Sequence, residues 1–224
     1  SSSSSSPPPK PHYSCALVTG ASTGIGREIA LELAFRGFLV FAGVRKASDG
    51  RSIREEFASA NPGIIGIVPI LFDVTWDEER LTETQSEILK TCSNANRAST
   101  ILVNNAGVQQ VAAIETANSP RDVFDVNVFG LLQVTKLFTP VIRRGVLILK
   151  ERAKNRGEND NASPDFSGRI VNIGSVAGFS TLPFYGLYSA TKRAVEAIND
   201  ALRLELNNDD IDVILIEPGA VLTS

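Results

Sequence analysis

Short apolar runs alternate along the chain with segments in which apolar residues recur at helical spacing. The runs predict six buried strands, at 15–19, 38–44, 64–72, 100–103, 169–173 and 211–216, the third broken by Pro69. The segments between them predict helices at 25–36, around 53–57, at 78–91, after the Ser119-Pro120 pair and at 187–206. Continuously apolar strands that alternate with helices are typical of a parallel sheet covered on both faces. The pattern therefore predicts an α/β, doubly wound, three-layer α/β/α domain, the Rossmann fold.

Two stretches lack this pattern. Residues 1–14 are rich in Ser and Pro and predict a disordered leader, so that 15–224 would form the single folded domain. Residues 150–167 are polar apart from Phe166 and predict a solvated insertion loop before the fifth strand. A partner contact is the alternative interpretation of this loop.

Composition excludes several classes of function. The 224 residues carry 22 basic and 25 acidic side chains, a net charge of −3, which argues against a nucleic-acid partner. No run of eighteen apolar residues occurs, so no membrane span is expected. Two cysteines are too few for a disulfide scaffold or a cysteine zinc site, and no metal site is expected. The one histidine, His12, lies in the leader, which excludes Ser-His-Asp and Cys-His catalysis.

A glycine-rich turn follows the first strand. It reads Thr19-Gly-Ala-Ser-Thr-Gly-Ile-Gly26, and its glycines allow left-handed turns and a close approach of backbone N–H groups to a ligand. The helix that begins there offers unpaired donors and a positive dipole end to a pyrophosphate. A tight turn alone is the alternative. The candidate cofactor-binding residues here are Gly20, Ser22, Thr23, Gly24, Ile25 and Gly26.

The end of the second strand bears on the choice of cofactor. An acidic residue there would hold a ribose 2′-hydroxyl, whereas an arginine accommodates a 2′-phosphate. The segment reads Ala42-Gly-Val-Arg-Lys46, with no acid before Asp49, so Arg45 with Ser22 favours NADP(H) over NAD(H). A solvated strand end is the alternative for Arg45. Asp73 and Val74 could meet an adenine amino group after the third strand, or Asp73 could serve only as a helix cap.

Tyr188 and Lys192 lie four residues apart on a predicted helix, and hence on one face. A lysine ammonium and a positive nicotinamide ring would lower the pKa of the phenol and let it exchange a proton with a hydroxyl or carbonyl group. Ser175 lies thirteen residues upstream at the carboxyl end of the fifth strand, the edge at which ligands bind in such sheets. Asn127 is a polar residue in an apolar helical stretch, for which a locally satisfied buried amide is the alternative.

These motifs together resemble the short-chain dehydrogenase/reductase family over essentially residues 15–223. The matching segments are Thr19–Gly26, Asn104–Gly107, Asn127, Ser175, Tyr188, Lys192 and Glu217-Pro218-Gly219 with Thr223. The resemblance implies an NADP(H)-preferring, NAD(H)-compatible oxidoreductase that interconverts an alcohol and a carbonyl. It implies Tyr188 as general acid/base, Ser175 on the substrate oxygen, Lys192 on the tyrosine and the ribose, and Asn127 as a relay that orders the lysine. It adds Asn105, Ala106, Gly107, Pro218 and Gly219, with Tyr188 and Lys192, to the cofactor site.

The resemblance also carries expectations about the whole protein. The Ala42–Lys46 segment and the surroundings of Ser175 are similar to the hydroxysteroid and retinol dehydrogenase branch, which implies a lipophilic small-molecule substrate. The family continues past a Pro-Gly segment with helices and a seventh strand, so we expect the chain to lack the C-terminal strand and helix and to aggregate through an exposed sixth strand. A homodimer or homotetramer in the cytoplasm is expected. The alternatives are a nucleotide-binding but catalytically inactive relative and an inactive fragment.

Overall fold

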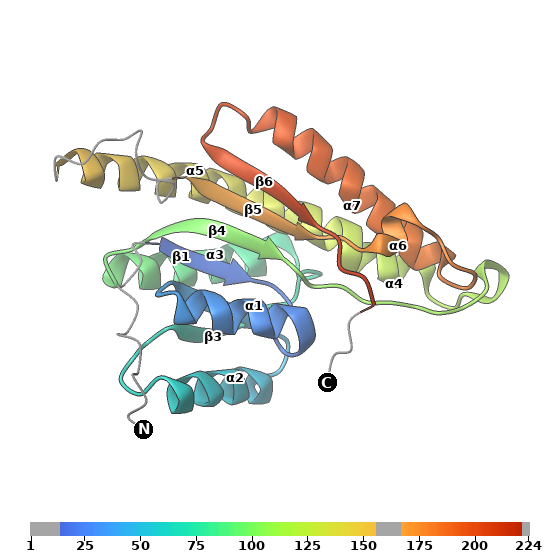
Figure 1. Cartoon of the computed structure of the whole chain (residues 1–224), viewed down its shortest axis with the longest axis horizontal. Coiled ribbons are helices and arrows are strands. Elements are labelled where there is room, and N and C mark those ends of the chain that lie inside the picture. The colour runs from blue at the N-terminus through green and yellow to red at the C-terminus, as the bar shows by residue number, and fades with distance from the viewer. Residues whose placement is uncertain (1–13, 156–166, 221–224) are drawn as a thin grey trace, which may run out of the picture.

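The computed structural model describes residues 14–155 and 167–220, which form one six-stranded parallel sheet (Figure 1). The order of the strands is β3-β2-β1-β4-β5-β6, and the chain crosses from β3 back over β1 to reach β4. The strands are β1 (Ser14–Val18), β2 (Leu39–Val44), β3 (Ile67–Leu71), β4 (Ala98–Asn104), β5 (Gly168–Ile173) and β6 (Ile211–Ile216). The predicted Rossmann fold is confirmed, and this reversal of strand order creates the crevice in which such sheets bind ligands.

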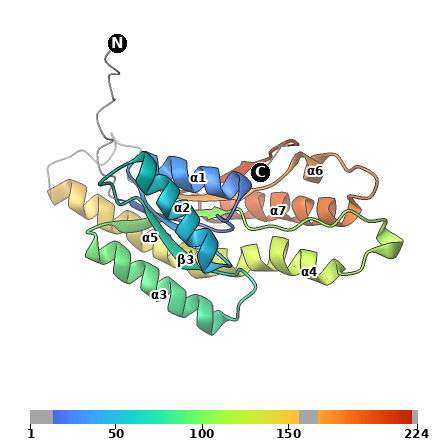
Figure 2. The same ribbon diagram turned by 90° about the horizontal axis from the view of Figure 1, so that it is seen from below.

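Helices cover both faces of the sheet (Figure 2). Side chains alternate across each strand, so that Cys15 and Leu17 of β1 point to one face and Ala16 and Val18 to the other. The Leu17 face packs against α3 (Glu78–Asn94), α5 (Leu131–Asn155) and α7 (Gly186–Glu205), and the Val18 face against α1 (Gly24–Phe35) and α2 (Ala47–Ala60). The remaining helices are short: η1 (Ile114–Thr116), α4 (Pro120–Phe124), η2 (Asp125–Gly130) and α6 (Val176–Phe179).

The third strand begins at Ile67, three residues later than predicted, and Pro69 lies inside it. β3 is an edge strand, paired only with β2, and Pro69 lies opposite Ala42. An edge position tolerates proline because one side of the strand needs no ladder hydrogen bond. Pro69 therefore does not break the strand. The sixth strand is the other edge, as predicted, with Ile214 and Ile216 exposed; aggregation through it stays a prediction.

The helix expected after Ser119-Pro120 consists of three parts. Pro120 occupies the first turn of α4, a π-helical turn (η2) follows, and α5 then runs on to Asn155. The insertion loop predicted for 150–167 is therefore wrong at its start, because residues 150–155 are helical and Ala153 among them packs into the core. Residues 156–166 lie outside the described part of the chain. The leader, expected to end at 14, also lies outside it except for Ser14, which is buried in β1.

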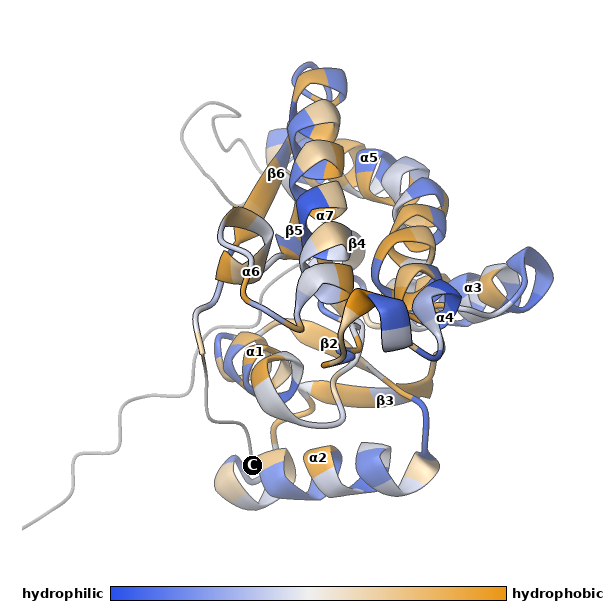
Figure 3. Ribbon diagram, turned by 90° about the vertical axis from the view of Figure 1, so that its right-hand side faces the viewer, coloured by the Kyte–Doolittle hydropathy of each residue, from blue (hydrophilic) through white to orange (hydrophobic). Residues whose placement is uncertain are grey.

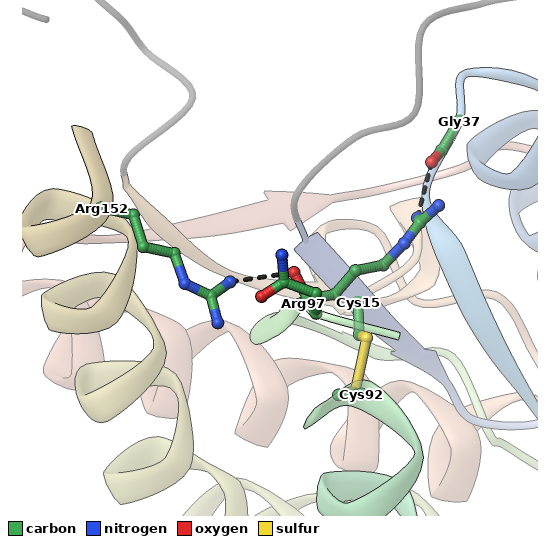
Figure 4. Close-up of a disulfide and its surroundings, with 6 residues drawn as sticks. Cys15, Gly37, Cys92, Arg97 and Arg152 are labelled. Carbon is green, nitrogen blue, oxygen red and sulfur yellow. Dashed lines mark hydrogen bonds between the residues drawn. A yellow bond between two sulfur atoms is a disulfide. The ribbon is translucent and has the colours of Figure 1, made fainter. Parts of the chain in front are cut away.

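The two cysteines, too few for a disulfide scaffold and not expected to pair, form a disulfide between β1 and α3 (Figure 4). The Cα atoms of Cys15 and Cys92 are 6.3 Å apart, and 77 residues separate them in the sequence. Next to them, Arg97 donates to the carbonyl oxygen of Gly37 at 2.7 Å and Arg152 donates to that of Asn96 at 2.9 Å. The disulfide lies at the start of β1, away from the carboxyl ends of the strands. Within the described ranges, no helix is long and apolar enough to cross a membrane.

Candidate active site

The carboxyl ends of the strands surround a cavity of about 790 Å³. Figure 3 looks onto this edge of the sheet, where the first turns of α1 and α7 face each other. Sixteen of the eighteen residues predicted for the site line the cavity: Gly20, Ser22, Thr23, Gly24, Ile25, Arg45, Asp73, Val74, Asn105, Ala106, Gly107, Ser175, Tyr188, Lys192, Pro218 and Gly219. Gly26 and Asn127 lie behind the cavity wall, both buried. Thr223 lies outside the described residues.

The glycine-rich turn is built so that backbone forms the cavity wall. Gly20 and Gly24 have φ of 65° and 59°, a region that other residues adopt only under strain. A Cβ atom at Gly26 would lie 2.2 Å from the Asn105 Nδ2 and 2.5 Å from the carbonyl oxygen of Gly20, so only glycine fits there. Thr23, before the first residue of α1, makes no side-chain cap, which leaves the N–H groups of that first turn to a ligand.

Thr19 and Asn105 hold the glycine turn against the end of β4. The Thr19 hydroxyl accepts from the backbone N–H groups of Asn105 and Ala106, both at 3.0 Å, and donates to the carbonyl oxygen of Val103 at 3.3 Å. The Asn105 amide donates to the carbonyl oxygens of Thr19 and Gly20 at 3.0 Å. Asn105 was among the predicted site residues, whereas Thr19 was not. Its position at the end of a buried strand, before a glycine, was the signal.

Arg45 follows β2 at the far end of the cavity from Tyr188. Its side chain is exposed, and within residues 14–155 and 167–220 no carboxylate or carbonyl group pairs with it. Asp73 lies opposite, after β3, and its Oδ1 accepts from the backbone N–H and the hydroxyl of Thr75 at 3.0 and 2.8 Å. The cap of α3 is Asp77 and not Asp73. This end of the cavity thus presents the unpaired guanidinium group of Arg45 and the carboxylate of Asp73, which is hydrogen-bonded within its own loop.

Tyr188 and Ser175 meet at the opposite end of the cavity. Ser175 precedes α6, and its Oγ accepts from the Ala177 N–H at 3.1 Å, so its own proton is directed elsewhere. Burial raises the pKa of Tyr188 above its ordinary value, and a hydrogen bond from Ser175 acts in the opposite direction with a smaller effect. The residues of the chain alone therefore do not give Tyr188 the lowered pKa that was expected.

Lys192 lies one turn after Tyr188 on α7 and is 6 % exposed. Its Nζ lies 5.6 Å from the centre of the Tyr188 ring and donates to the carbonyl oxygen of Ile173, at the end of β5, at 2.7 Å. Burial lowers the pKa of Lys192 to about 8. The ammonium group thus faces the cavity from the tyrosine side, with one backbone partner and two remaining donor protons.

Asn127 lies in the π-helical turn η2 and is buried. Its Oδ1 accepts from the Val108 N–H at 2.8 Å, and its Nδ2 donates to the carbonyl oxygen of Val108 at 2.8 Å and to the Thr191 hydroxyl at 3.0 Å. The Thr191 hydroxyl donates in turn to the carbonyl oxygen of Tyr188 at 2.7 Å. Asn127 therefore links the loop after β4 to the first turns of α7, and its direct partners are Val108 and Thr191 where the sequence suggested Lys192.

The residues present fit a dinucleotide. The glycine turn lines an open cavity, and the Thr23 side chain does not cap the first N–H groups of α1, from which a pyrophosphate could therefore accept hydrogen bonds. The cavity also has the size of a site for a cofactor-sized ligand. In contrast, the described residues contain no group of three or more His, Cys, Asp or Glu side chains that could hold a metal ion.

Comparison with known proteins gives matches over nearly the whole chain. A sequence model of the short chain dehydrogenase family matches residues 14–149 and 161–224. The NADPH-dependent 3-dehydrocapnine reductase of Ornithobacterium rhinotracheale is 33 % identical over 210 residues, which cover 93 % of this chain and 65 % of that protein. The mitochondrial D-beta-hydroxybutyrate dehydrogenase of Rattus norvegicus is 30 % identical over 205 residues, which cover 91 % and 53 %.

Solved structures match in the same way. A short-chain dehydrogenase from Streptomyces avermitilis superposes with a TM-score of 0.72 at 31 % identity, over 95 % of this chain and 67 % of that one. A metagenomic short-chain oxidoreductase solved in complex with NADP superposes with a TM-score of 0.75 at 23 % identity, over 94 % and 84 %, which shows a shared fold. The chain spans 65 % and 53 % of the length of the two curated relatives above.

Proposed function

The chain belongs to the short-chain dehydrogenase family, and from this premise we propose that it is a nicotinamide-dependent oxidoreductase that interconverts an alcohol and a carbonyl compound. The observation that carries the proposal is the group formed by Ser175, Tyr188 and Lys192. The two residues of α7 face the cavity from successive turns, and Ser175 approaches the phenol from the end of β5. A phenol, a hydroxyl and a buried ammonium around one open space provide an acid, a donor to an oxygen atom and a positive charge.

The cofactor would lie along the cavity between its two ends. The N–H groups of the glycine turn would hold the pyrophosphate, Asp73 and Val74 the adenine, and Asn105–Gly107 the wall behind it. Lys192 would hold the nicotinamide ribose with the donor protons that Ile173 leaves free. Pro218 and Gly219 would border the nicotinamide. When bound, the cofactor supplies or accepts the hydride.

Tyr188 would transfer the proton. In the direction of reduction, the phenol donates its proton to the carbonyl oxygen as that oxygen gains negative charge, while the Ser175 hydroxyl donates a hydrogen bond to the same atom. The raised pKa keeps the phenol protonated at neutral pH, which suits this direction. In the direction of oxidation, the phenolate must accept a proton, so this direction should gain from higher pH.

We propose NADP(H) as the preferred cofactor because of Arg45. Its unpaired, exposed guanidinium group lies where an adenosine 2′-phosphate would come, and a guanidinium group matches the geometry of a phosphate. The NADPH dependence in the name of the Ornithobacterium rhinotracheale reductase, at 33 % identity, supports the same choice. NAD(H) remains compatible with the rest of the site.

Replacing Tyr188 by Phe tests the proposal. The variant lacks only the proton-bearing oxygen, so turnover of carbonyl substrates should fall by at least 10²-fold, the usual contribution of a general acid. Binding of NADPH, followed by its fluorescence, should change less than threefold. In the same titrations, the wild-type chain should bind NADPH more tightly than NADH.

The control is Tyr185→Phe, because Tyr185 also lines the cavity but belongs to the loop before α7. Equal turnover by Tyr188→Phe and the wild type would overturn the assignment of the acid. Tight NADPH binding without any Tyr188-dependent turnover would favour a nucleotide-binding protein that is catalytically inactive.

A further inference from the structure

Six large, exposed apolar side chains are carried by the two connections that border the Tyr188 side of the cavity. We call this group the apolar rim, and its members are between 47 % and 78 % exposed. They are Val111, Ile114, Val176, Phe179, Leu182 and Phe184. Two come from the connection between β4 and α4, and four from the connection between β5 and α7. Single exposed apolar residues are ordinary on a protein surface, whereas a group of this size beside a cavity indicates a binding surface.

Direct contacts join the two connections that carry the apolar rim. The Ala112 N–H donates to the carbonyl oxygen of Phe184 at 3.0 Å. The side chain of Ile114 lies against Gly186, where a Cβ would come within 2.9 Å of it. Val176 and Leu182 also line the cavity that holds Tyr188. The apolar rim is therefore continuous with the space in which the proposed reaction takes place. In Figure 3, apolar segments are visible at α6 and beside the first turn of α7.

Phe184 is held in an unfavourable backbone conformation. Its φ is 68°, in the left-handed region that glycine and asparagine tolerate and that a bulky residue rarely adopts. The ring is nevertheless exposed to solvent, so burial in the core does not account for it. Strain of this kind persists where the structure around it fixes the backbone, and it is concentrated at ligand sites. An aromatic residue at this position is best explained by a role of its side chain at the mouth of the cavity.

The charges around the cavity indicate which ligands the apolar rim suits. Three charged residues line the cavity within the described ranges: Arg45, Asp73 and Lys192. The first two lie at the adenine end, and the Nζ of Lys192 is held at Ile173. Among the described residues, the lining at the Tyr188 end therefore has no free guanidinium or ammonium group that would bind the carboxylate or phosphate of a polar substrate. Arg193 lies next to the apolar rim, but Glu196 and the carbonyl oxygen of Phe179 hold its guanidinium group.

We infer that the substrate carries its carbonyl or hydroxyl group on an extended apolar chain or ring system, which packs against the apolar rim, and that Phe184 is a specificity-determining residue. This inference rests on the proposed function and names the substrate class of the same site. The reacting oxygen would lie between Ser175 and Tyr188, and the apolar part would leave the cavity past Val176 and Leu182 toward Phe184. Each buried methylene group would raise affinity by about fourfold.

Paired alcohols test the inference without requiring turnover. The full chain, saturated with NADP, is titrated with 1-butanol and with 1-octanol, and binding is followed by calorimetry and by the shift in melting temperature. Burying all four additional methylene groups would favour 1-octanol by on the order of a hundredfold. We expect at least a tenfold preference. Equal affinities would overturn the inference, and so would a preference for 1-butanol.

Phe184→Gly separates the side chain from the backbone. Glycine adopts a φ of 68° without strain, so the melting temperature should stay constant or rise, while the preference for 1-octanol should fall at least fivefold. Phe184→Asn, which also tolerates this φ, should lose the preference in the same way. The control is Ile65→Gly, which replaces an exposed apolar residue before β3 and should keep the preference.

The remaining outcomes are also decisive. A variant at Phe184 that retains the full preference would overturn its role in specificity. If the wild type forms dimers that Phe184→Gly dissolves, and shows no preference between the alcohols, the apolar rim is an interface between copies and the inference is wrong. Absence of NADPH binding, or turnover that Tyr188→Phe leaves unchanged, would instead overturn the proposed function, which the alcohol titrations do not measure.

Discussion

The side chain of Lys192 is buried against the end of β5, where its ammonium group has replaced most of its water by one carbonyl oxygen. Burial disfavours the charged form, and the pKa of Lys192 falls from 10.5 to about 8. A lysine that titrates near the working pH can serve a site that exchanges protons. Lys192 must also influence folding, because the folded state binds the proton of its side chain more weakly than the unfolded state does.

The contribution of Lys192 to stability should therefore rise with pH. Below pH 8 the lysine is protonated in both states and the penalty for burying the charge is fully present; between about 8 and 10.5 the folded state loses its proton first, and the penalty disappears. Lys192→Met removes the charge. At pH 7 the variant should be more stable than the wild type. The difference between their free energies of unfolding should become smaller by about 2–3 kcal/mol between pH 7 and pH 10.

Urea unfolding at the two pH values measures this difference. Because other groups also titrate, the informative quantity is the wild type compared with the variant at each pH. Lys90→Met, at an exposed position of α3, is the matched control and should show no comparable trend. A difference between the wild type and Lys192→Met that stays constant with pH would contradict the lowered pKa.

Among the elements, the junction of β1 and α1 has the least room for change. Gly26 is in the first turn of α1, and a methyl group there would overlap the Asn105 amide and the carbonyl oxygen of Gly20. Neither can retreat freely, because the Asn105 amide is bonded to the backbone of Thr19 and Gly20. The helix and the loop after β4 can therefore approach each other only across a glycine.

Gly26→Ala should consequently disturb both folding and ligand binding. We expect the free energy of unfolding to fall by about 1–3 kcal/mol, as for other overpacked sites, and NADPH affinity to fall at least tenfold. Urea unfolding and a fluorescence titration measure the two effects. Glu28→Ala, at an exposed position of the same helix, should change neither. Wild-type affinity in Gly26→Ala would mean that the turn adapts more easily than its hydrogen bonds indicate.

The sequence predicts the elements of this fold well where apolar residues are continuous. All six strands are predictable because each contains a short apolar run, and the ends predicted for β6 agree with the structure although Asp212 lies within it. The last six residues of α5 were missed, because a solvated helix end with one core residue, Ala153, has too few apolar positions to show a period. The π-helical turn was missed because it has no compositional signal, although Asn127 was recognised as unusual within it.

The site was predictable for a topological reason. Residues that follow different parallel strands meet at one edge of the sheet, so Gly20, Arg45, Asp73, Asn105 and Ser175 were expected to come together, and they line one cavity. Hydrogen-bond partners were not predictable, because they depend on distances between segments far apart in the sequence. The bonds from Asn127 to Val108 and Thr191, and the strained backbone of Phe184, are visible only in the folded chain.

At the scale of the molecule, the Cys15–Cys92 disulfide closes a loop that contains α1, β2, α2 and β3. Both cysteines are buried in the core that the sheet forms with α3 and α5. A covalent link across a sequence separation of 77 residues restricts the unfolded chain, which is the main way in which a disulfide stabilises a fold. The disulfide thus links β1 to α3 at the edge of the sheet opposite to the cavity.

Reduction of this disulfide should lower the free energy of unfolding by about 2–4 kcal/mol. Urea unfolding with and without a phosphine reductant measures the change. The double variant Cys15→Ala/Cys92→Ala should be insensitive to the reductant and should lie close to the reduced wild type. NADPH affinity should be unchanged under conditions in which the chain stays folded, because the disulfide lies at the opposite edge of the sheet. An identical midpoint for oxidised and reduced wild type would show that the link contributes nothing.

The π-helical turn around Asn127 makes the geometry of the site depend on the number of residues in this segment. A π turn contains one residue more than the α-helical turn it replaces. The segment between α4 and α5 therefore has one residue more than a regular helix would have there. Loss of a single residue from 125–130 would convert the turn to regular helix and rotate every preceding side chain by about 100°. Where the lost residue follows Asn127, the Asn127 amide would turn away from Val108 and Thr191. An insertion or deletion in this short segment should thus disrupt the site more than a substitution does.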